Sequence, residues 1–332
     1  MTYDGRALAN ARTELESIRE RNSAEHERRL KQVYHKVPEI EDIDARLRAQ
    51  MGQLVAAAAS GRAAAKGKIA EIRDANLSLQ MRKAELLVEN GYPSDYLNDI
   101  YSCERCKDTG VYNQGVCSCL QKLYKKELSR ELSPLMRAGN ESFDNFDLSL
   151  YPSVYNAEYS CVPAEYMGKV LAACKKFAED FPAVSSNLLL AGGAGLGKTY
   201  LSACIAREVS SRGSSVCYRT ASQAFDSFEA EKFSRDPDEA AAAAKSVKRM
   251  LDCDLMILDD LGTELVTPAS SSALYTLINT RINEKRPMVI NTNLTSADIA
   301  KKYSPAVASR LEGEFMRLVF IGNDIRLILK NR

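Results

Sequence analysis

The residues of this chain whose types and spacing could do chemistry begin with a glycine-rich stretch near its middle. Residues 192–199 have the spacing Gly-x-x-x-x-Gly-Lys-Thr, after an apolar run at 188–190 and before a helical pattern. A strand, such a loop and a helix in this order cradle phosphate groups, because the loop N–H groups and the helix N-terminus point at phosphate oxygens. The sequence therefore predicts a nucleoside triphosphate site. Its expected members are Gly192, Gly193, Ala194, Gly195, Leu196, Gly197, Lys198, Thr199 and Tyr200.

Two side chains of this loop have predicted roles of their own. Lys198 is expected to reach the β- and γ-phosphates, and the Thr199 hydroxyl is expected to coordinate Mg²⁺. The alternative is a glycine-rich turn that arose by chance. Because the motif and its strand–helix context agree, the phosphate-binding interpretation is the stronger one.

The second motif is a pair of acidic residues that follows an apolar run at 255–258. Asp259 and Asp260 end this predicted strand, at the edge where open α/β sheets bind their ligands. We expect Asp259 to hold Mg²⁺ through water and Asp260 to polarise the attacking water. Aspartate is shorter than the glutamate common at this position, so slow hydrolysis is expected. Glu264 could assist or replace Asp260.

One asparagine and three arginines complete the candidate catalytic set. Asn293 follows the next predicted strand and is placed to hydrogen-bond the γ-phosphate or the lytic water, although asparagine also forms turns. Arg310 is a candidate arginine finger for a neighbouring subunit's nucleotide. Arg326 is a candidate for the same subunit, and Arg317 is a spare. The alternative for each arginine is an ordinary surface ion pair.

Four cysteines have the spacing of metal ligands. Cys103-x-x-Cys106 is followed, after ten residues, by Cys117-x-Cys119, with turn-forming residues between the pairs. Four thiolates without an open position make a structural zinc site rather than a catalytic one. An iron–sulfur cluster and uncoordinated thiols are the alternatives. The other cysteines are expected to be small buried apolar residues: Cys161, Cys174, Cys204, Cys217 and Cys253.

Composition limits the class of protein. In 332 residues, 45 Lys and Arg nearly balance 44 Asp and Glu, so any DNA contact must be a local patch. The sequence contains no apolar run of about 20 residues and no signal-peptide core at its N-terminus. A cytoplasmic protein with no membrane partner is therefore expected, and its nine cysteines are not expected to form disulfides.

The elements that must position these residues fall into two patterns. Helical patterns cover 11–37, 39–60 and 69–91, interrupted at Pro38 and ending at a candidate C-cap glycine, Gly91. They predict a small helical bundle, which is either a solvated spacer or a docking surface for a protein partner.

From about residue 160, helices alternate with strands, which predicts a mostly parallel sheet covered by helices. The expected strands are 187–192, 215–222, 254–264 and 287–295, and an extended pattern covers 316–328. A basic helix at 120–139 and an irregular aromatic segment at 141–159 precede them. The basic helix is either a solvated face or a phosphate contact, and the aromatic segment is expected to wrap the edge of the following domain.

Taken in order, these motifs resemble one family. The stretches at 192–206, 255–264, 290–294 and 308–313 are similar to the AAA+ ATPase core of bacterial replicative-helicase loaders of the DnaC/DnaI type, a core shared by IstB transposition ATPases. The cysteine region and the phrase from Tyr34 to Ile40 resemble the DnaI-like branch.

The resemblance implies fold, cofactors and partners. It implies an α/β AAA+ P-loop domain at 161–332, a helical partner-binding region at 1–92, a zinc module at 93–130 and a linker at 131–160. The cofactors would be ATP, Mg²⁺ and Zn²⁺. The partners would be a hexameric replicative helicase of the DnaB type, single-stranded DNA and further copies of the chain, which associate through the AAA+ domain.

The resemblance also assigns roles to single residues. Lys198 and Thr199 become the Walker A pair, and Asp259 and Asp260 the Walker B pair. Asn293 becomes the first sensor, and the finger and second-sensor roles fall on Arg310 and Arg326.

The implied function is ATP-dependent loading of the helicase onto single-stranded DNA at replication initiation or restart, with slow hydrolysis stimulated by DNA or assembly. The alternative is an IstB-like or phage accessory ATPase that assists a transposase or another DNA-remodelling partner. A non-enzymatic zinc adaptor fits poorly with the intact Lys198, Thr199 and Asp259.

Overall fold

The computed structural model describes residues 3–59, 62–132, 141–183 and 186–330. Contacts divide the chain into two compact units, Arg12–Leu120 and Met1–Ala11 with Gln121–Arg332. Within the described residues, no helix is both long enough and apolar enough to cross a membrane.

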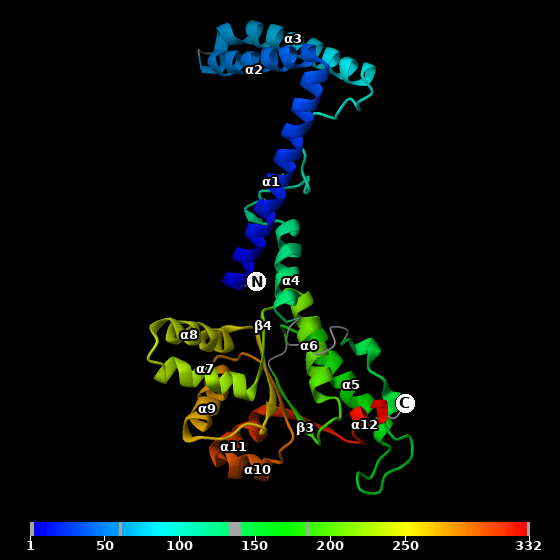
Figure 1. Cartoon of the computed structure of the whole chain (residues 1–332), viewed down its shortest axis with the longest axis vertical. Helices are drawn as coiled ribbons and strands as arrows, with labels where there is room; N and C mark the ends of the chain where they lie inside the picture. The colour runs from blue at the N-terminus through cyan, green and yellow to red at the C-terminus, as the bar shows by residue number, and fades with distance from the viewer. Residues whose placement is uncertain (1–2, 60–61, 133–140, 184–185, 331–332) are drawn as a thin grey trace. The chain divides into compact units, whose positions relative to one another are not determined.

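The first unit is built on the three predicted helices (Figure 1). They are α1 (Gly5–Lys36), α2 (Pro38–Ala59) and α3 (Arg62–Glu89). Proline lacks the N–H that a helix interior needs, so Pro38 begins a new helix instead of continuing α1. The apolar core between them consists of Val33, Val37, Ile40, Ile43, Leu86, Leu87 and Leu97.

The end of α3 confirms the predicted glycine cap. Gly91 has φ +83°, a conformation that glycine adopts at little cost, and the Tyr92 amide donates to Leu87 O at 2.9 Å. The chain then contacts α1 again, where Lys36 Nζ donates to Asn90 O at 2.9 Å. The segment after α3 is therefore held on the first helix.

The second unit contains a five-stranded parallel sheet in the order β4-β5-β6-β3-β7. The strands are β3 (Asn187–Gly192), β4 (Val216–Thr220), β5 (Leu255–Leu261), β6 (Met288–Thr292) and β7 (Phe315–Phe320). All four predicted strands are present. Their near-continuous apolar sequences suit strands that are covered on both faces.

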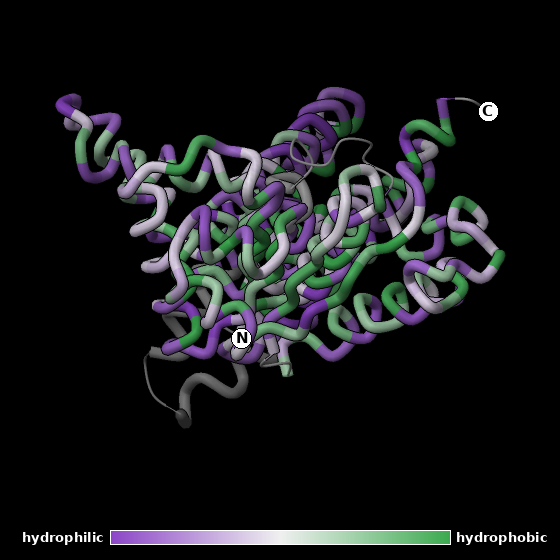
Figure 2. The backbone as a smooth tube through the Cα atoms, turned by 90° about the horizontal axis from the view of Figure 1, so that it is seen from below, coloured by the Kyte–Doolittle hydropathy of each residue, from purple (hydrophilic) through white to green (hydrophobic). Residues whose placement is uncertain are grey.

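Helices cover both faces of this sheet, as Figure 1 shows. In Figure 2 the helices alternate between hydrophilic and hydrophobic residues along their turns, as expected for elements with one buried face. One face carries α5 (Pro163–Asp180) and α6 (Lys198–Ser211). The other carries α7 (Ala221–Phe233), α8 (Pro237–Asp252), α9 (Pro268–Asn283), α10 (Ser296–Lys302) and α11 (Pro305–Glu314).

The end of the chain departs from the sequence prediction. The extended pattern expected over 316–328 is a strand only to Phe320, and Ile325–Lys330 form the helix α12. The Asp324 carboxylate accepts a hydrogen bond from the Arg326 amide at 2.9 Å, which starts a helical turn despite the branched residues that follow. The prediction of an extended end was wrong over α12.

The segments before the sheet follow the predictions where they are described. The basic helix α4 spans Ser118–Leu132, and residues 133–140 of that prediction lie outside the described residues. The aromatic segment is irregular apart from the short helices η2 (Phe143–Asn145) and η3 (Leu148–Leu150).

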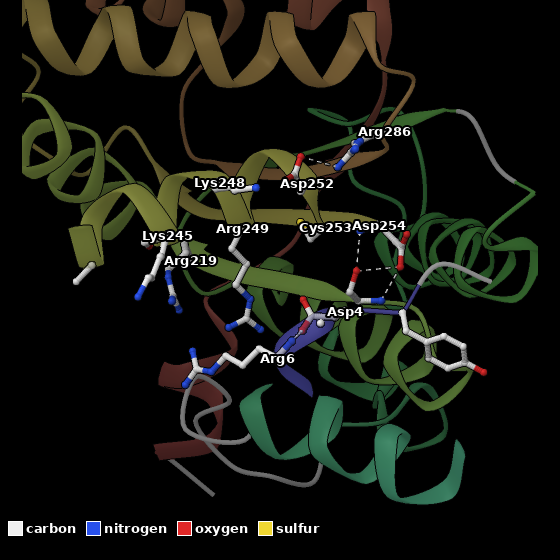
Figure 3. Close-up of a pocket in the computed structure, with 15 residues that line it drawn as sticks. Asp4, Arg6, Arg219, Lys245, Lys248, Arg249, Asp252, Cys253, Asp254 and Arg286 are labelled. Carbon is white, nitrogen blue, oxygen red and sulfur yellow. Dashed lines mark hydrogen bonds and ion pairs between the residues drawn. The ribbon is translucent and has the colours of Figure 1, made fainter. Parts of the chain in front are cut away.

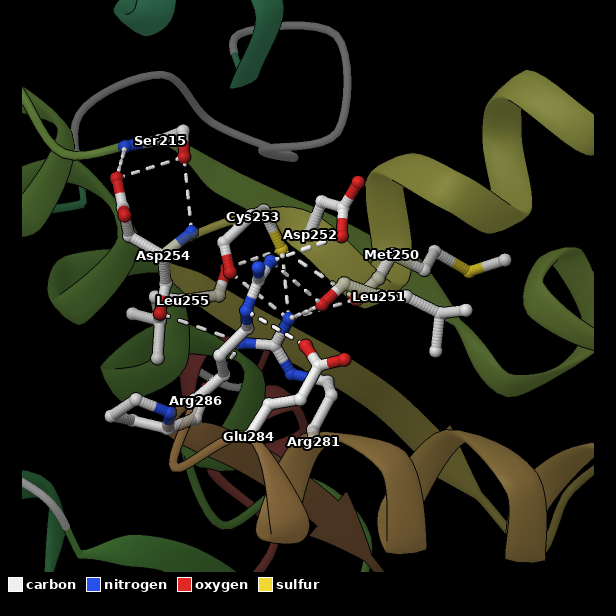
Figure 4. Close-up of polar contacts among 11 residues, drawn as sticks. Ser215, Met250, Leu251, Asp252, Cys253, Asp254, Leu255, Arg281, Glu284 and Arg286 are labelled. Atoms are coloured by element: carbon white, nitrogen blue, oxygen red, sulfur yellow. Dashed lines mark hydrogen bonds and ion pairs between the residues drawn. The ribbon is translucent and has the colours of Figure 1, made fainter. Parts of the chain in front are cut away.

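A fully buried arginine joins three elements (Figure 4). Nη1 of Arg281, near the end of α9, donates to the backbone oxygens of Met250, Leu251 and Cys253 at 2.9, 2.9 and 3.0 Å. Nη2 donates to Pro287 O at 2.8 Å. The last carbonyls of a helix have no partner within the helix, so Arg281 caps the C-terminal end of α8.

Candidate nucleotide and metal sites

The glycine-rich loop joins β3 to α6 in a conformation that only glycine adopts easily. Gly192 has φ +147° and Gly197 has φ +92°. A Cβ atom on Gly197 would lie 2.9 Å from the Tyr151 hydroxyl, and that hydroxyl donates to Leu196 O at 2.8 Å. The aromatic segment before the sheet therefore supports the loop from outside.

Lys198 lies at the centre of the loop. Its Nζ donates to Gly192 O at 2.7 Å, to Gly193 O at 2.6 Å and to Asn293 Oδ1 at 2.6 Å. Burial lowers the pKa of Lys198 to about 8, against the opposing attraction of the Asp260 and Asp259 carboxylates. The structure thus brings the loop lysine and Asn293, which are distant in the sequence, into direct contact.

Asp259 lies at the centre of a buried hydrogen-bond network. Its Oδ1 accepts from Asn291 Nδ2 at 2.6 Å, from the Asp260 amide at 2.9 Å and from Thr199 Oγ1 at 3.2 Å. Its Oδ2 accepts from the Tyr218 hydroxyl at 2.6 Å. Burial, followed by the Asp259 charge, raises the pKa of Tyr218, so Tyr218 remains a donor. The carboxylate is fixed in position by neighbours on three strands.

Three members of this network were missed by the sequence prediction. Ser202 on α6 accepts from Asn291 Nδ2 at 2.8 Å and lies 3.2 Å from the Tyr218 hydroxyl. For Asn291 the sequence did contain a signal. It is a polar side chain inside the otherwise apolar strand β6, and a buried polar group must find a partner. Nothing local identifies that partner as Asp259.

A cavity of 720 Å³ opens over the loop. The predicted residues that line it are Ala194, Gly195, Leu196, Gly197, Lys198, Thr199, Tyr200, Asp260, Asn293 and Arg326. Gly192 and Gly193 contribute their carbonyls to Lys198, and Asp259 is buried beside Thr199. The structure therefore brings nearly all of the predicted nucleotide-site residues to one place.

Part of the cavity's lining was not predicted. The aromatic segment and α12 supply apolar side chains, and the aromatic segment also supplies polar ones: Phe146, Leu150, Ile325 and Leu329 beside Glu141, Asn145 and Asp147. The helix is attached to the loop, because the Ile325 amide donates to Gly195 O at 3.0 Å. A cavity that combines phosphate-binding groups with apolar side chains suits a nucleotide, whose base is flat and largely apolar.

The remaining candidates lie outside this cavity. Arg310 is half-buried on α11 and does not line this cavity. Arg317 on β7 donates to Ser296 Oγ at 3.1 Å. The Glu264 carboxylate accepts from the Gly262 amide at 3.0 Å and from the Tyr303 hydroxyl, so it is engaged away from the cavity.

The four predicted cysteines form a cluster in the first unit. Their sulfur atoms all lie within 4.8 Å of one another, with Cys103 Sγ 3.8 Å from Cys117 Sγ and Cys106 Sγ 3.4 Å from Cys119 Sγ. A tetrahedral site with Zn–S bonds of about 2.3 Å has edges of about 3.8 Å. The donor set and its spacing therefore fit a tetrahedral metal ion.

The surrounding backbone fixes this cluster. The Gly110 amide donates to Cys106 Sγ at 3.4 Å, and the two strands β1 (Val111–Tyr112) and β2 (Gly115–Val116) bring the cysteine pairs together. A hydrogen bond from the Cys119 backbone lowers the pKa of the Cys117 thiol to about 7. Burial raises the pKa of the neighbouring Cys119 thiol, so of these two thiols Cys117 ionises first.

Asp108 connects the cluster to α1. Its buried carboxylate accepts from the Ser102 amide at 2.9 Å, the Cys103 amide at 2.8 Å and Asn22 Nδ2 at 2.9 Å. Asn22 lies on α1, so the cysteine module is held on the first helix of its own unit.

Comparison with known proteins agrees with this geometry. Residues 168–309 match the family described as IstB-like ATP binding protein. This part of the chain is an IstB-like ATP-binding domain. Its parallel sheet order and covering helices are AAA+-like, as predicted.

The similarity to helicase loaders is distant. The replicative helicase loaders DnaC of Escherichia coli K12 and of Shigella flexneri are each 23% identical over 170 residues, which cover 50% of this chain and 66% of theirs, just under two thirds. Among solved structures, the DnaC helicase loader gives a TM-score of 0.45 at 20% identity, covering 55% of this chain and 97% of that one. A structure of DnaI gives 0.42 at 20% identity, covering 56% and 91%.

Proposed function

We propose that this protein is an ATPase that loads a replicative DNA helicase onto single-stranded DNA. The observation that carries the ATPase part is the cavity in which Lys198, Asn293 and the acidic strand end of Asp259 and Asp260 converge. The distant similarity to DnaC loaders over 170 residues supports the loading part.

In this proposal the residues of the cavity divide the work. Lys198 contacts the β- and γ-phosphates, and the Thr199 hydroxyl coordinates Mg²⁺. Asp259 holds the metal ion through water, because its Oδ1 already accepts three hydrogen bonds from the protein. Asp260 and Asn293 line the cavity and orient the attacking water.

The arginines have proposed roles that depend on assembly. Arg326 lines the cavity and would stabilise charge on the nucleotide of its own subunit. Arg310 would reach the nucleotide of a neighbouring copy, which makes hydrolysis depend on self-association through the ATPase domain.

The four-cysteine cluster is proposed to hold zinc as a structural ion. All four positions of the tetrahedron would be filled by thiolates, which leaves no position open for a substrate. The ion would stabilise the fold of residues 93–130 and contribute no step of the reaction.

The helicase is proposed to dock on the helical region at 1–92. An apolar stripe on α3 supports this, because Leu77, Met81 and Val88 are 57%, 59% and 60% exposed. A solvated spacer would not need large apolar side chains in water, whereas a docking helix uses them as anchors.

The alternative function is that of an accessory ATPase for a transposase. The observation that favours it is the family match, since residues 168–309 match IstB-like ATP binding proteins. That match covers only the ATP-binding domain, so it does not indicate which protein binds the helical region.

The deciding experiment is co-elution of the full chain with the host's replicative helicase in the presence of ATP. We expect a stable complex that Leu77→Glu with Met81→Glu abolishes, because two charges would be buried in an apolar contact. The matched control is Ser78→Glu with Gln80→Glu, which adds the same charges at exposed polar positions of α3 and should leave the complex intact. If no complex forms and DNA still stimulates the ATPase, the transposase partner replaces the helicase.

A further inference from the structure

Tyr218 and Arg219 are neighbours on β4, and their side chains lie on opposite faces of the sheet. Arg219 lines a hollow that shares no residue with the nucleotide cavity (Figure 3). Side chains alternate along a strand, so Tyr218 points to the other face, where it lines the nucleotide cavity and reaches Asp259. Tyr218 is thus a buried residue whose hydroxyl lies beside the carboxylate that is proposed to hold Mg²⁺.

The two carboxylate oxygens of Asp259 have different surroundings. Oδ1 accepts three hydrogen bonds, from Asn291 Nδ2, the Asp260 amide and Thr199 Oγ1. In the part of the chain that the structure describes, Oδ2 accepts one, from the Tyr218 hydroxyl at 2.6 Å. A carboxylate oxygen accepts at about two lone pairs, so Oδ1 is saturated, whereas Oδ2 can accept from a further donor.

The backbone of β5 is irregular at this carboxylate. The pairing of β5 with β6 shifts in register between Leu258 and Leu261, and Asp260 has φ +56°. This left-handed conformation is unfavourable for a residue other than glycine and persists where the surroundings fix it. In it, the Asp260 amide donates to Asp259 Oδ1 at 2.9 Å. Irregularities of this kind re-aim side chains beside active sites, so this one supports a fixed orientation of Asp259.

Asn291 holds the carboxylate from the neighbouring strand β6. It is fully buried, and its Nδ2 donates to Asp259 Oδ1 at 2.6 Å and to Ser202 Oγ at 2.8 Å. The amide cannot be reversed, because its own oxygen would then face the carboxylate. Within the described residues, Oδ1 of Asn291 has no hydrogen-bond partner. A buried strand does not need such an unpaired group for its packing, so the contribution of Asn291 is the bond to Asp259.

We propose that Tyr218 and Asn291 are positioning residues that orient Asp259 so that its Oδ2 accepts a hydrogen bond from a water ligand of Mg²⁺. Hydroxyl and carboxylate oxygens suit Mg²⁺, which keeps several water ligands, and Thr199 Oγ1 lies 3.2 Å from Asp259 Oδ1. Tyr218 and Asn291 act through Asp259 and fix it from the two strands that flank β5. The inference rests on the proposed ATPase function.

The test compares nucleotide affinity with and without the metal ion. A fluorescent ATP analogue is titrated in Mg²⁺ and, separately, in EDTA, and the dissociation constant in EDTA divided by that in Mg²⁺ is the magnesium ratio. Tyr218→Phe and Asn291→Leu should each lower this ratio about tenfold, while the dissociation constant in EDTA stays within about twofold of the wild-type value. Melting curves check folding. Tyr218→Phe removes a single oxygen atom, so it decides the question even where Asn291→Leu lowers stability.

The matched control is Tyr34→Phe, which removes another tyrosine hydroxyl that donates to an aspartate, Asp44 at 2.8 Å, in the other compact unit. Both dissociation constants should keep their wild-type values in this variant. The inference is overturned if Tyr218→Phe keeps the wild-type magnesium ratio. It is also overturned if this variant weakens binding equally in Mg²⁺ and in EDTA, because the residue then has a structural role only.

The wild-type protein separates these outcomes from failure of the proposed function. If it binds no ATP analogue, the proposed ATP site is wrong, and the inference fails with it. If it binds the analogue equally well in Mg²⁺ and in EDTA, the proposed metal role of Asp259 is wrong, and the inference fails for that reason. A wild-type magnesium ratio well above one, together with an unchanged ratio in Tyr218→Phe, refutes the inference alone.

Discussion

At the scale of single residues, Lys198 has three oxygen partners within the protein. Two are carbonyls of its own loop and one is the Asn293 side chain. A bound nucleotide must share or replace these partners. Nucleotide binding at the loop would therefore change the hydrogen bond between Lys198 and Asn293, which follows β6.

The low pKa of Lys198 predicts that nucleotide binding takes up a proton. With a pKa of about 8, most of the free protein has a neutral Lys198 at pH 8.5, and phosphate charges would raise that pKa in the complex. We expect uptake of roughly 0.5 to 0.8 proton per nucleotide at pH 8.5 and almost none at pH 6.5. Calorimetry in buffers of different ionisation enthalpy measures it.

The sign of this effect also fixes the pH dependence of affinity. Because the complex needs the charged lysine, the affinity for ATP should fall as pH rises through 8 and stay level below about 7. Binding enthalpies that are the same in all buffers at pH 8.5 would show that Lys198 keeps its proton in the free protein.

The sequence identified residues whose roles are encoded by local spacing. Lys198 and Thr199 belong to a contiguous motif, and Asp259 ends an apolar run, so their approximate places follow from the chain itself. Tyr218 and Asn291 could not be found in this way. They meet Asp259 only because β4 and β6 flank β5 in the sheet, an order that spacing along the chain does not contain.

At the scale of elements, Arg281 decides how α8 ends. It donates to carbonyls of the last turn and to the residue after it, and its hydrogen-bond partners are backbone oxygens and the Cys253 sulfur. A buried guanidinium satisfied by carbonyls stabilises only as long as all its partners are present.

We expect Arg281→Met to lower the free energy of unfolding by roughly 3 to 5 kcal/mol, because it leaves several buried carbonyls without donors. Urea denaturation measures the change. The control is Arg286→Met, which removes partly exposed ion pairs to Asp252 and Glu284 and a hydrogen bond to Leu251 O, a carbonyl that keeps Arg281 as donor; it should cost about 1 kcal/mol or less. An equal loss of unfolding free energy in the two variants would mean that the buried hydrogen bonds of Arg281 stabilise the protein no more than the exposed ion pairs of Arg286.

Helices and strands could be predicted where a regular pattern of apolar residues extends over many positions. The helices of the first unit and the strands β3 to β6 follow the expected patterns. The helix α12 was missed because Ile, Leu and Ile in its sequence favour a strand, while the turn at Asp324 and contact with the loop at Gly195 select a helix. Such tertiary contacts override local propensity.

At the scale of the whole molecule, the two candidate sites belong to different compact units. The cysteine cluster lies in Arg12–Leu120, and the nucleotide cavity lies in the unit that contains Gln121–Arg332. Each unit has its own apolar core. The sequence could predict that such modules exist and their order along the chain, because each carries its own motif.

Removing the proposed zinc should therefore affect one unit alone. We expect a strong chelator to release one zinc per chain and to expose the four cysteines to alkylation, since the ion holds their loop together. ATP affinity should change less than about twofold, since no cysteine of the cluster lines the cavity. Mass spectrometry of alkylated peptides and a fluorescent ATP analogue measure the two effects. Parallel loss of ATP binding would show that the units depend on each other.

The side chains that α12 supplies to the cavity have a consequence for synthesis of the protein. About 130 residues separate the glycine-rich loop from α12, so at roughly 5 to 20 residues per second the ribosome needs roughly 7 to 26 s to pass from one to the other. During this interval the nascent chain has its phosphate loop but lacks Ile325, Arg326 and Leu329. The helical unit has emerged long before. The helical unit, which is proposed to dock a protein partner, is thus synthesised in full before the lining of the proposed nucleotide cavity is complete.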